Sequence, residues 1–313
     1  MAMALSARRA LSGGLDSRQI AAVSVILKGD LNSQIHFQSR ELGVLLLQDP
    51  TLRVCLIKRA SRVGDYWSGD VALPGGKAEA GESSLQCAIR ETLEELGLDL
   101  SNSKAYRHLG QGNELKIGNA KKGMLIIPHF FAVTSAATPE MRLNPPEVDY
   151  AWWHPISDLL PGCRNDDYVS VDIVSRYLRR YIAVKDYPKI ILTRLTMALT
   201  GCKTIQFRSH KLFFCLEGNK EMTEHLWGLT LKLLQDNFGG DSKLPEQRSF
   251  LRLPDNYVID KSLVFIHGIS RGRVGPIEAI VVAFLMYLSA IFSGSYLALA
   301  LAQRVLVGDS SHH

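Results

Sequence analysis

Short apolar runs alternate with polar, glycine-bearing segments through the first half of the chain. Residues 44–47 and 53–60 are two such runs on either side of Asp49-Pro50, and they predict two strands joined by a turn. Residues 71–77 predict a third strand that ends in a Pro-Gly-Gly sequence. Further strands of the same sheet are predicted at residues 104–111, 125–135 and 147–156.

A helix is predicted between these strands, over residues 83–96. Ser83 and Gln86 form a capping-box pattern at its start, and Gly97 stands where a helix would end. Strands with a helix between them are typical of an α/β layered domain. One face of the helix would pack on the sheet through Leu85, Ala88, Ile89 and Leu96.

The chain is more irregular and basic from residue 160 to residue 216. This stretch holds ten Lys or Arg and four Asp, so it carries most of the net charge of +5. A basic face could hold a polyanionic substrate or lie against anionic lipid, although a simply solvated face is favoured. Residues 221–238 predict an amphipathic helix that closes a domain spanning 21–238, and 239–276 are typical of a linker.

An uncharged apolar run of 24 residues occupies positions 279–302. As a helix rising about 1.5 Å per residue it would be about 36 Å long, enough to cross a hydrocarbon core of about 30 Å. We therefore predict a transmembrane helix over 277–303, with a buried core helix as the alternative. A short tail, 304–313, would follow, and the flanking charges favour a cytoplasmic main domain, anchored in a mitochondrial or endoplasmic reticulum membrane.

The amino-acid composition excludes some classes of protein but does not decide between these alternatives. The 313 residues are 46% hydrophobic, which excludes a disordered or collagen-like chain. The five cysteines include no CxxC pair, and their odd number favours a reducing compartment. Residues 1–20 predict either a frayed start or a mitochondrial presequence. Nucleic acid is not an expected partner, and the oligomeric state stays open.

Three glutamates share one arc of the predicted helix. Glu91, Glu94 and Glu95 stand at positions i, i+3 and i+4, where like charges repel. A bound Mg²⁺ or Mn²⁺ would explain this arrangement, because both ions prefer carboxylate oxygens. A solvated acidic helix face is the alternative.

The surrounding spacing favours the metal site. The segment resembles the Nudix box, whose seven fixed positions are matched by Gly76, Glu82, Arg90, Glu91, Glu94, Glu95 and Gly97. Thr92 stands where the family usually has an aliphatic residue, which is a core-packing substitution that leaves the charged set intact.

The resemblance implies a Nudix α/β/α sandwich with a mixed sheet and Mg²⁺- or Mn²⁺-dependent hydrolysis of a nucleoside diphosphate linked to another group. It implies Glu91, Glu94 and Arg90 as catalytic residues, with Arg90 holding the carboxylates by ion pairing. The metal ligands implied by the resemblance are Glu82, Glu91, Glu94, Glu95 and the carbonyl of Gly75. Clustered carboxylates that bind metal suit this chemistry, because phosphoryl transfer needs charge neutralisation and a positioned water.

The segment before the box is similar to that of coenzyme A diphosphatase-like Nudix proteins. Gly69, Pro74, Gly75 and Gly76 match, while Leu73 replaces a Phe and Asp65 stands where that subgroup has an Arg. Arg59 and Arg62 lie nearby and are the expected substrate-binding residues, with coenzyme A or acyl-CoA as the expected substrate. Glu114, Glu140 and Glu147 are candidates for a further metal ligand.

Two hypotheses follow. In the first, the chain is an active, membrane-tethered Nudix diphosphatase. In the second, the domain is a non-catalytic module that binds a nucleotide or a protein at a membrane. The complete acidic set favours the enzyme.

Overall fold

The computed structural model describes two compact units. It covers residues 20–29, 51–62, 65, 67–117, 123–135, 137, 139–159, 166–172, 191, 194, 204–216, 220–238, 282–286, 288–289 and 292–294. The first unit comprises Met1–Asp167 with Ser209–Leu244, and the second comprises Tyr168–Arg208 with Pro245–His313. The Nudix box and its surroundings lie entirely within the first unit.

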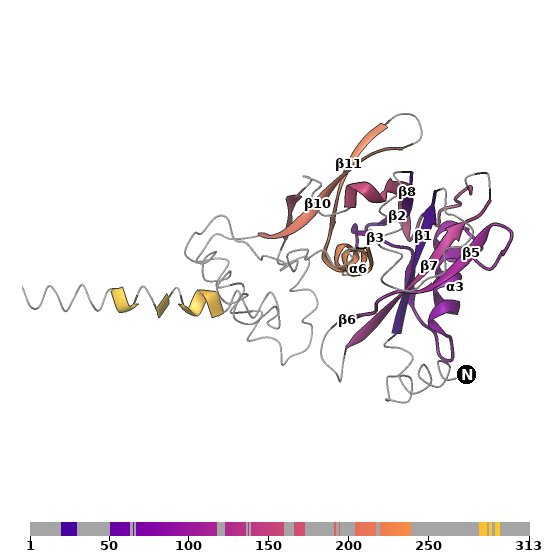
Figure 1. Ribbon diagram of the computed structural model, residues 1–313. Helices are drawn as coiled ribbons and strands as arrows, with labels where there is room; N and C mark the ends of the chain where they lie inside the picture. Colours follow the sequence, from indigo (N-terminus) through magenta and orange to yellow (C-terminus); the bar gives the residue numbers. More distant parts are fainter. Residues whose placement is uncertain are drawn as a thin grey trace, which may run out of the picture. The chain divides into compact units, whose positions relative to one another are not determined.

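An eight-stranded mixed sheet forms the centre of the first unit (Figure 1). Its main strand order is β3-β2-β1-β7-β5, while β4 pairs with β1, β6 pairs with β7 and β8 pairs with β2. The strands are β1 (Ile20–Lys28), β2 (Arg53–Arg59), β3 (Val71–Ala72), β4 (Gly75–Lys77), β5 (Tyr106–Gln111), β6 (Leu115–Ile117), β7 (Met124–Val133) and β8 (Val148–Pro155).

The strands β1 and β7 run parallel to each other in the middle of the sheet. Their register pairs Ile20 with Leu125 and continues to Leu27 opposite Ala132. The other pairings are antiparallel, so the predicted mixed sheet is confirmed. Strand β1 was not predicted from the sequence, because a continuous apolar run does not distinguish a central strand from a helix.

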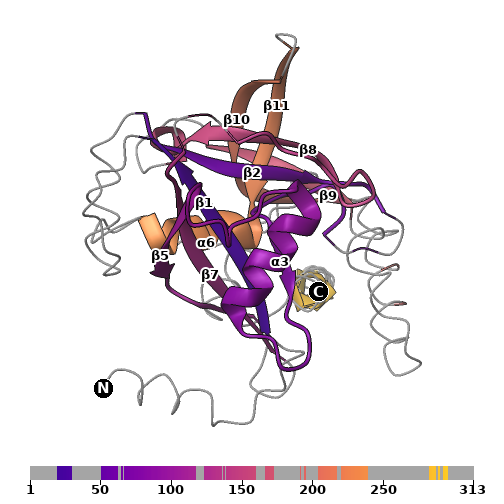
Figure 2. The same ribbon diagram turned by 90° about the vertical axis from the view of Figure 1, so that its right-hand side faces the viewer.

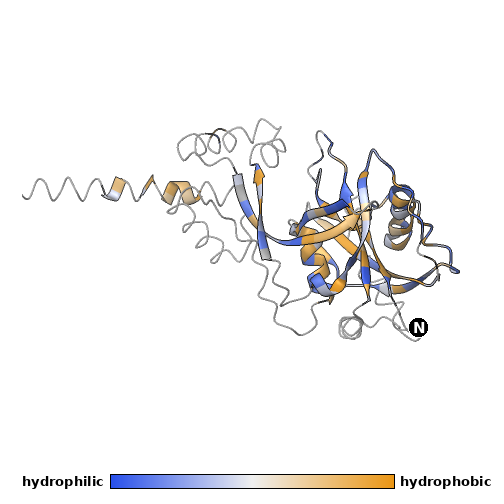
Figure 3. Cartoon of the chain, turned by 90° about the horizontal axis from the view of Figure 1, so that it is seen from above, coloured by the Kyte–Doolittle hydropathy of each residue, from blue (hydrophilic) through white to orange (hydrophobic). Residues whose placement is uncertain are grey.

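Each face of the sheet is covered by one helix, α3 (Ser84–Leu96) or α6 (Gly228–Phe238). Side chains alternate across a strand, so Val25 and Leu27 of β1 join the core on the α6 side, while Ile26 joins the core on the α3 side. Figure 2 shows α3 in front of β1 and β7, with α6 behind them. In Figure 3, α6 is coloured mainly hydrophobic, whereas α3 and the strands carry residues of both kinds.

The ends of α3 are those the sequence predicts. The Ser83 side chain accepts a hydrogen bond from Gln86 N–H and the Gln86 side chain accepts one from Ser83 N–H, so the capping box is confirmed. Gly97 adopts the left-handed conformation with φ 68°, and its N–H donates to Leu93 O. Cys87, Ala88 and Leu96 are buried against the sheet.

Thr92 of α3 takes part in a buried hydrogen-bond network. It is fully buried, and its Oγ1 lies 2.8 Å from both Ser24 Oγ on β1 and the Ala88 carbonyl. Ser24 Oγ also donates to that carbonyl at 3.0 Å. The substitution at position 92 therefore replaces an apolar contact with a polar connection between α3 and β1.

The prediction of one helix over 221–238 is wrong in its first half. Residues Lys220–Trp227 form β11, which pairs with β10 (Thr204–Leu216), and β10 also pairs with β9 (Asp166–Asp172). Strands β9 and β10 also lie in the stretch that we expected to be irregular. The alternation of β11 is concealed in the sequence because a charged residue, Glu224, occupies one of its inward positions.

Glu224 connects β11 to the main sheet. Its carboxylate accepts hydrogen bonds from Lys58 Nζ of β2 at 2.6 Å and from the Tyr150 hydroxyl of β8. Next to it, the rings of Trp152 and Phe214 stack with centroids 4.1 Å apart. Gly228 follows β11 with φ +61°, a conformation that favours glycine, and α6 begins there.

The predicted C-terminal transmembrane helix is corrected by the structure. Among the described residues, no helix is long and apolar enough to cross a membrane. Of the apolar run, the structure describes residues 282–286, 288–289 and 292–294, and these are helical. An uncharged apolar sequence can form a membrane span or a buried helix, so apolarity alone did not determine the outcome.

Several other predictions lie outside the described residues. These are the strand at 44–47, the N-terminal segment 1–19, the linker 239–276 and the tail 304–313. The boundaries of the domain, of the basic insertion and of these segments stay predictions, as does the cytoplasmic orientation.

The Thr92 network gives a test of how α3 is held on the sheet. Thr92→Val should lower the free energy of unfolding by about 1 kcal/mol, the usual net contribution of one hydrogen bond. Ser24→Ala should have an effect of similar size. The double variant should lose clearly less than the sum, because removing both partners leaves no buried group unpaired. Denaturant unfolding of the four proteins measures this, and strictly additive losses would contradict the network.

Candidate functional site

The Pro-Gly-Gly sequence after β3 places the backbone of β4 directly against β1 and α3. Val23 pairs with Gly75, and Ala22 pairs with Gly76. At Gly75, with φ +149°, a Cβ atom would lie 2.2 Å from the Ala22 carbonyl oxygen. At Gly76 a Cβ atom would lie 2.4 Å from the Glu91 carboxyl group. A side chain at either position would therefore clash with neighbouring atoms. Glycine at position 76 leaves room for the Glu91 carboxylate.

Arg90 holds three of the box glutamates together. Its Nε and Nη2 bind the two oxygens of Glu82 at 2.8 and 3.0 Å, which is a bidentate pair. Its Nη1 lies 2.9 Å from Glu91 Oε1 and 3.0 Å from Glu94 Oε2. Nη2 also donates to the Lys77 carbonyl at 3.2 Å. The predicted role of Arg90, ion pairing with the carboxylates, agrees with this geometry.

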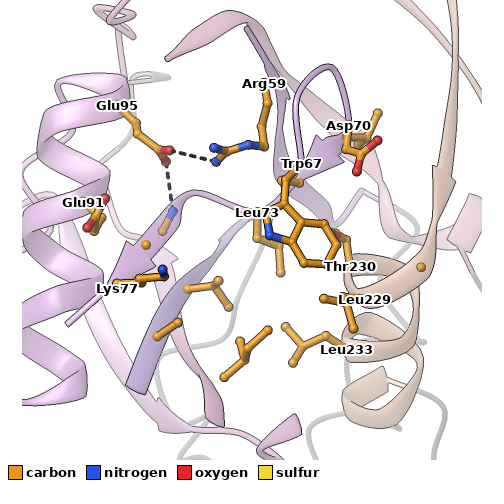
Figure 4. Close-up of a pocket in the computed structure, with 18 of the residues that line it drawn as sticks. Arg59, Trp67, Asp70, Leu73, Lys77, Glu91, Glu95, Leu229, Thr230 and Leu233 are labelled. Carbon is orange, nitrogen blue, oxygen red and sulfur yellow. Dashed lines mark hydrogen bonds and ion pairs between the residues drawn. The ribbon is translucent and has the colours of Figure 1, made fainter. Parts of the chain in front are cut away.

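Glu95 points the other way, into the space between α3 and β4. Only 3% of its surface is exposed. Its Oε2 accepts the Gly75 N–H at 2.9 Å, and its Oε1 lies 3.9 Å from Arg59 Nη1 (Figure 4). The Arg59 guanidinium has a closer partner, because its Nη2 lies 2.8 Å from Asp65 Oδ2. Glu95 is therefore a buried carboxylate whose nearest cationic side chain, Arg59, is also paired with Asp65.

The protonation equilibria follow from these surroundings. Burial raises the pKa of Glu95 to about 8, against the opposing effects of the Gly75 N–H and Arg59. Burial also raises the pKa of Glu91, which the hydrogen bond from Arg90 partly offsets. By contrast, the hydrogen bond from Arg90 lowers the pKa of Glu82. The two glutamates nearest β4 are those whose negative charge is least compensated.

This donor set fits a hard divalent cation. Glu91 and Glu95 supply oxygen ligands of the type that Mg²⁺ and Mn²⁺ prefer, and the missing Cβ of Gly76 leaves space beside Glu91. A cation between them would offset the charges that burial makes unfavourable. In the part of the chain that the structure describes, no three His, Cys, Asp or Glu side chains are already grouped as metal ligands. In this structure Arg90 contacts Glu91 and Glu94, and Arg59 lies 3.9 Å from Glu95.

A cavity of about 490 Å³ opens beside Glu91 and Glu95. Figure 4 shows it between α3, which carries the two glutamates, and α6, which carries Leu229, Thr230 and Leu233. Arg59, Lys77, Gly75 and Gly76 line the acidic end. Trp67 and the residues from α6 were missed by the sequence analysis, because α6 lies more than 130 positions after the box.

The predicted site residues are only partly brought together at this cavity. Glu91, Glu95, Gly75 and Arg59 line it, whereas Glu82, Glu94 and Arg90 lie beside it on α3 and in the loop before α3. Arg62 is not among the lining residues; it binds the Pro146 carbonyl and Glu147, the latter at 3.1 Å. Of the three further ligand candidates, Glu147 lines the cavity and Glu114 and Glu140 do not.

Comparison with known families gives a match over part of the chain. Residues 38–172 are similar to the NUDIX domain and match its family model. The match includes the whole acidic set on α3 and the loop before it. The coenzyme A diphosphatase-like subgroup is not confirmed by it.

Curated proteins and solved structures give partial matches. An uncharacterized protein of Schizosaccharomyces pombe is 36% identical over 148 residues, 47% of this chain and 43% of that protein. Nudix hydrolase 15, mitochondrial, of Arabidopsis thaliana is 43% identical over 70 residues, 21% of this chain and 24% of its own. The chain therefore spans less than half the length of these relatives. The crystal structure of a Nudix hydrolase from M. smegmatis is 17% identical, with TM-score 0.32, over 45% of this chain and 73% of that one.

Removal of the Arg90 charge should destabilise the carboxylate cluster. Arg90→Gln should lower the free energy of unfolding by about 2 kcal/mol, because Glu82 and Glu91 lose a charged partner while they remain partly buried. Added Mg²⁺ should recover part of the loss by binding the same carboxylates.

The matched control is Lys232→Gln in α6. Its cation pairs with Asp236 on the exposed surface at 2.8 Å, so the loss should be below about 0.5 kcal/mol. Denaturant unfolding with and without Mg²⁺ measures both variants. Equal losses in the two variants would contradict the central position of Arg90.

Proposed function

We propose that the chain is a metal-dependent hydrolase that cleaves the diphosphate bond of a nucleoside diphosphate linked to another group. One observation carries this proposal: Glu91 and Glu95, two carboxylates with raised pKa values, meet at one end of a cavity against a glycine backbone. Burial raises the free energy of two negative charges placed next to each other, and a bound cation would lower it further than the contacts with Arg90 and Arg59 do. The Nudix family match and the complete box support the same conclusion.

The side chains divide the work between them. Glu82, Glu91, Glu94, Glu95 and the Gly75 carbonyl would hold Mg²⁺ or Mn²⁺. The ion would neutralise charge on the phosphate oxygens and lower the pKa of a water molecule. Glu91 lies at this end of the cavity and would orient that water and accept its proton. Arg90 keeps the carboxylates in position, and Arg59 and Lys77 supply positive charge at the same end of the cavity.

Coenzyme A or acyl-CoA is the substrate we propose within this class. The loop that resembles the coenzyme A diphosphatase-like subgroup contributes Leu73, Gly75 and Gly76 to the cavity wall. Arg59 lies there as well, although it is paired with Asp65. Arg62 would act as a substrate-binding residue only after release from Glu147.

The test is product release by the full-length protein against a substrate panel. Coenzyme A, acyl-CoA, NADH, ADP-ribose, dinucleoside polyphosphates and nucleoside triphosphates would each be offered with Mg²⁺ or Mn²⁺. Glu91→Gln should lower kcat on the cleaved substrate by about 100-fold or more, because the proton acceptor is lost. Glu114→Gln, the same change at an exposed site outside the cavity, should leave kcat unchanged.

Two results would contradict the proposal. The first is binding of a panel compound without cleavage under any metal condition, which would favour a non-catalytic binding module. The second is cleavage that survives unchanged in Glu91→Gln, which would place the chemistry elsewhere.

A further inference from the structure

We propose that the second end of the cavity binds an apolar chain attached to the diphosphate. This end is formed by Trp67, Leu73, Leu229 and Leu233, and we call it the apolar end. The inference rests on the proposed function, which places the diphosphate at Glu91 and Glu95.

Figure 4 shows how the two ends of the cavity differ. The glutamates of α3 lie on one side, while Leu229 and Leu233 of α6 lie on the other, and the Trp67 indole extends toward them. Trp67 is 36% exposed, so much of its ring meets solvent in this structure. Further apolar side chains complete the wall: Val23, Val71, Met124, Ile126.

The charged groups of the wall are largely satisfied within the protein. The Asp65 carboxylate binds Arg59 at 2.8 Å and also accepts a hydrogen bond from the backbone N–H of Trp67 at 2.9 Å. Glu147 binds Arg62 at 3.1 Å. Among the described residues that line the cavity there is no Asn, Gln or His side chain, the groups that commonly recognise the edges of a nucleobase. Asp70 and Thr230 are polar residues at this end, and its other side chains are mainly apolar, which suits a hydrocarbon chain.

The apolar end is also held in shape before any ligand binds. Leu233 is almost fully buried in the core, and α6 begins directly after β11, which Glu224 fastens to Lys58 and Tyr150. A preformed apolar pocket binds a chain without a large ordering cost. Each methylene group that it fully buries should improve affinity by up to about fourfold.

Two kinds of compound carry a chain of this chemistry. One is a fatty acyl-CoA, in which the chain lies at the far end of a diphosphate-linked arm. The other is a prenyl diphosphate, in which the chain is attached to the diphosphate directly. The shared chemistry is a diphosphate and a hydrocarbon chain, and the experiment separates the two sources.

The probes are n-alkyl esters of methylenediphosphonate, which cannot be hydrolysed between the phosphorus atoms. Calorimetric titration of the full-length protein with Mg²⁺ would compare chains of increasing length with methylenediphosphonate itself. The dissociation constant should fall by about twofold to fourfold per methylene until the cavity is filled, and then level off.

Two variants test whether Trp67 and Leu229 cause the gain in affinity with chain length. Trp67→Ala and Leu229→Gln should bind the unsubstituted methylenediphosphonate as the wild type does, but lose most of the gain from chain length. Phe213→Ala is the matched control, because this aromatic side chain is 57% exposed and lies outside the cavity wall. It should retain the full gain.

A competition experiment then distinguishes a fatty acyl-CoA from a prenyl diphosphate. Octanoyl-CoA and geranyl diphosphate would each be titrated against the longest probe, and the compound that displaces it at lower concentration is the closer match to the natural ligand. Displacement by neither compound would overturn the assignment of an apolar chain.

Failure of this inference and failure of the proposed function give different results. Affinity that does not change with chain length, or that changes equally in Trp67→Ala, overturns the apolar end even if diphosphates are cleaved. A chain-length gain that is lost in both variants supports it even where no compound in the substrate panel is cleaved, and in that case only the hydrolase proposal fails.

Discussion

The site depends on carboxylates that are placed close together on α3 and partly buried. Arg90 makes this arrangement possible, because its guanidinium binds Glu82 in bidentate fashion and reaches Glu91 and Glu94 with the remaining nitrogen. Arginine suits this position better than lysine, since its planar group offers several donors in fixed directions. Glu95 lies outside the reach of Arg90 and relies on the Gly75 N–H. In the function proposed above, the negative charge of Glu91 and Glu95 would bind a cation at this end of the cavity.

The polar contacts of Glu224 determine the position of α6, which forms the second wall of the cavity. Glu224 brings β11 to β2 and β8, and α6 starts immediately after that strand. The helix thereby supplies Leu229 and Leu233 to a cavity whose acidic wall belongs to the Nudix box. Residues far apart in the sequence thus line one cavity. The contacts of Glu224, which take no part in the proposed reaction, position the α6 wall of that cavity.

The sequence predicted the ends of α3 and the contacts of Arg90 better than it predicted the fold around them. The capping box at Ser83, the end of the helix at Gly97 and the role of Arg90 depend on local spacing, and local spacing is visible in a sequence. The strand β11 was taken as helix because Glu224 interrupts its apolar alternation, and its partners, Lys58 and Tyr150, are remote in sequence. The apolar run near the C-terminus suggested a membrane span from composition alone, but among the described residues no helix is long and apolar enough to cross a membrane. Trp67 gave no signal, because the other residues of the cavity wall beside it, such as Leu229, are remote in sequence.

Direct binding of Mn²⁺ tests the account most directly, because every step attributed to the box requires a metal held by its carboxylates. Electron paramagnetic resonance of free Mn²⁺ in a titration of the full-length protein would measure it. The account predicts binding that is lost or greatly weakened in Glu95→Gln, and competition by Mg²⁺ for the same site. Equal binding by Glu95→Gln and the wild type would contradict the assignment of the buried carboxylates to a metal.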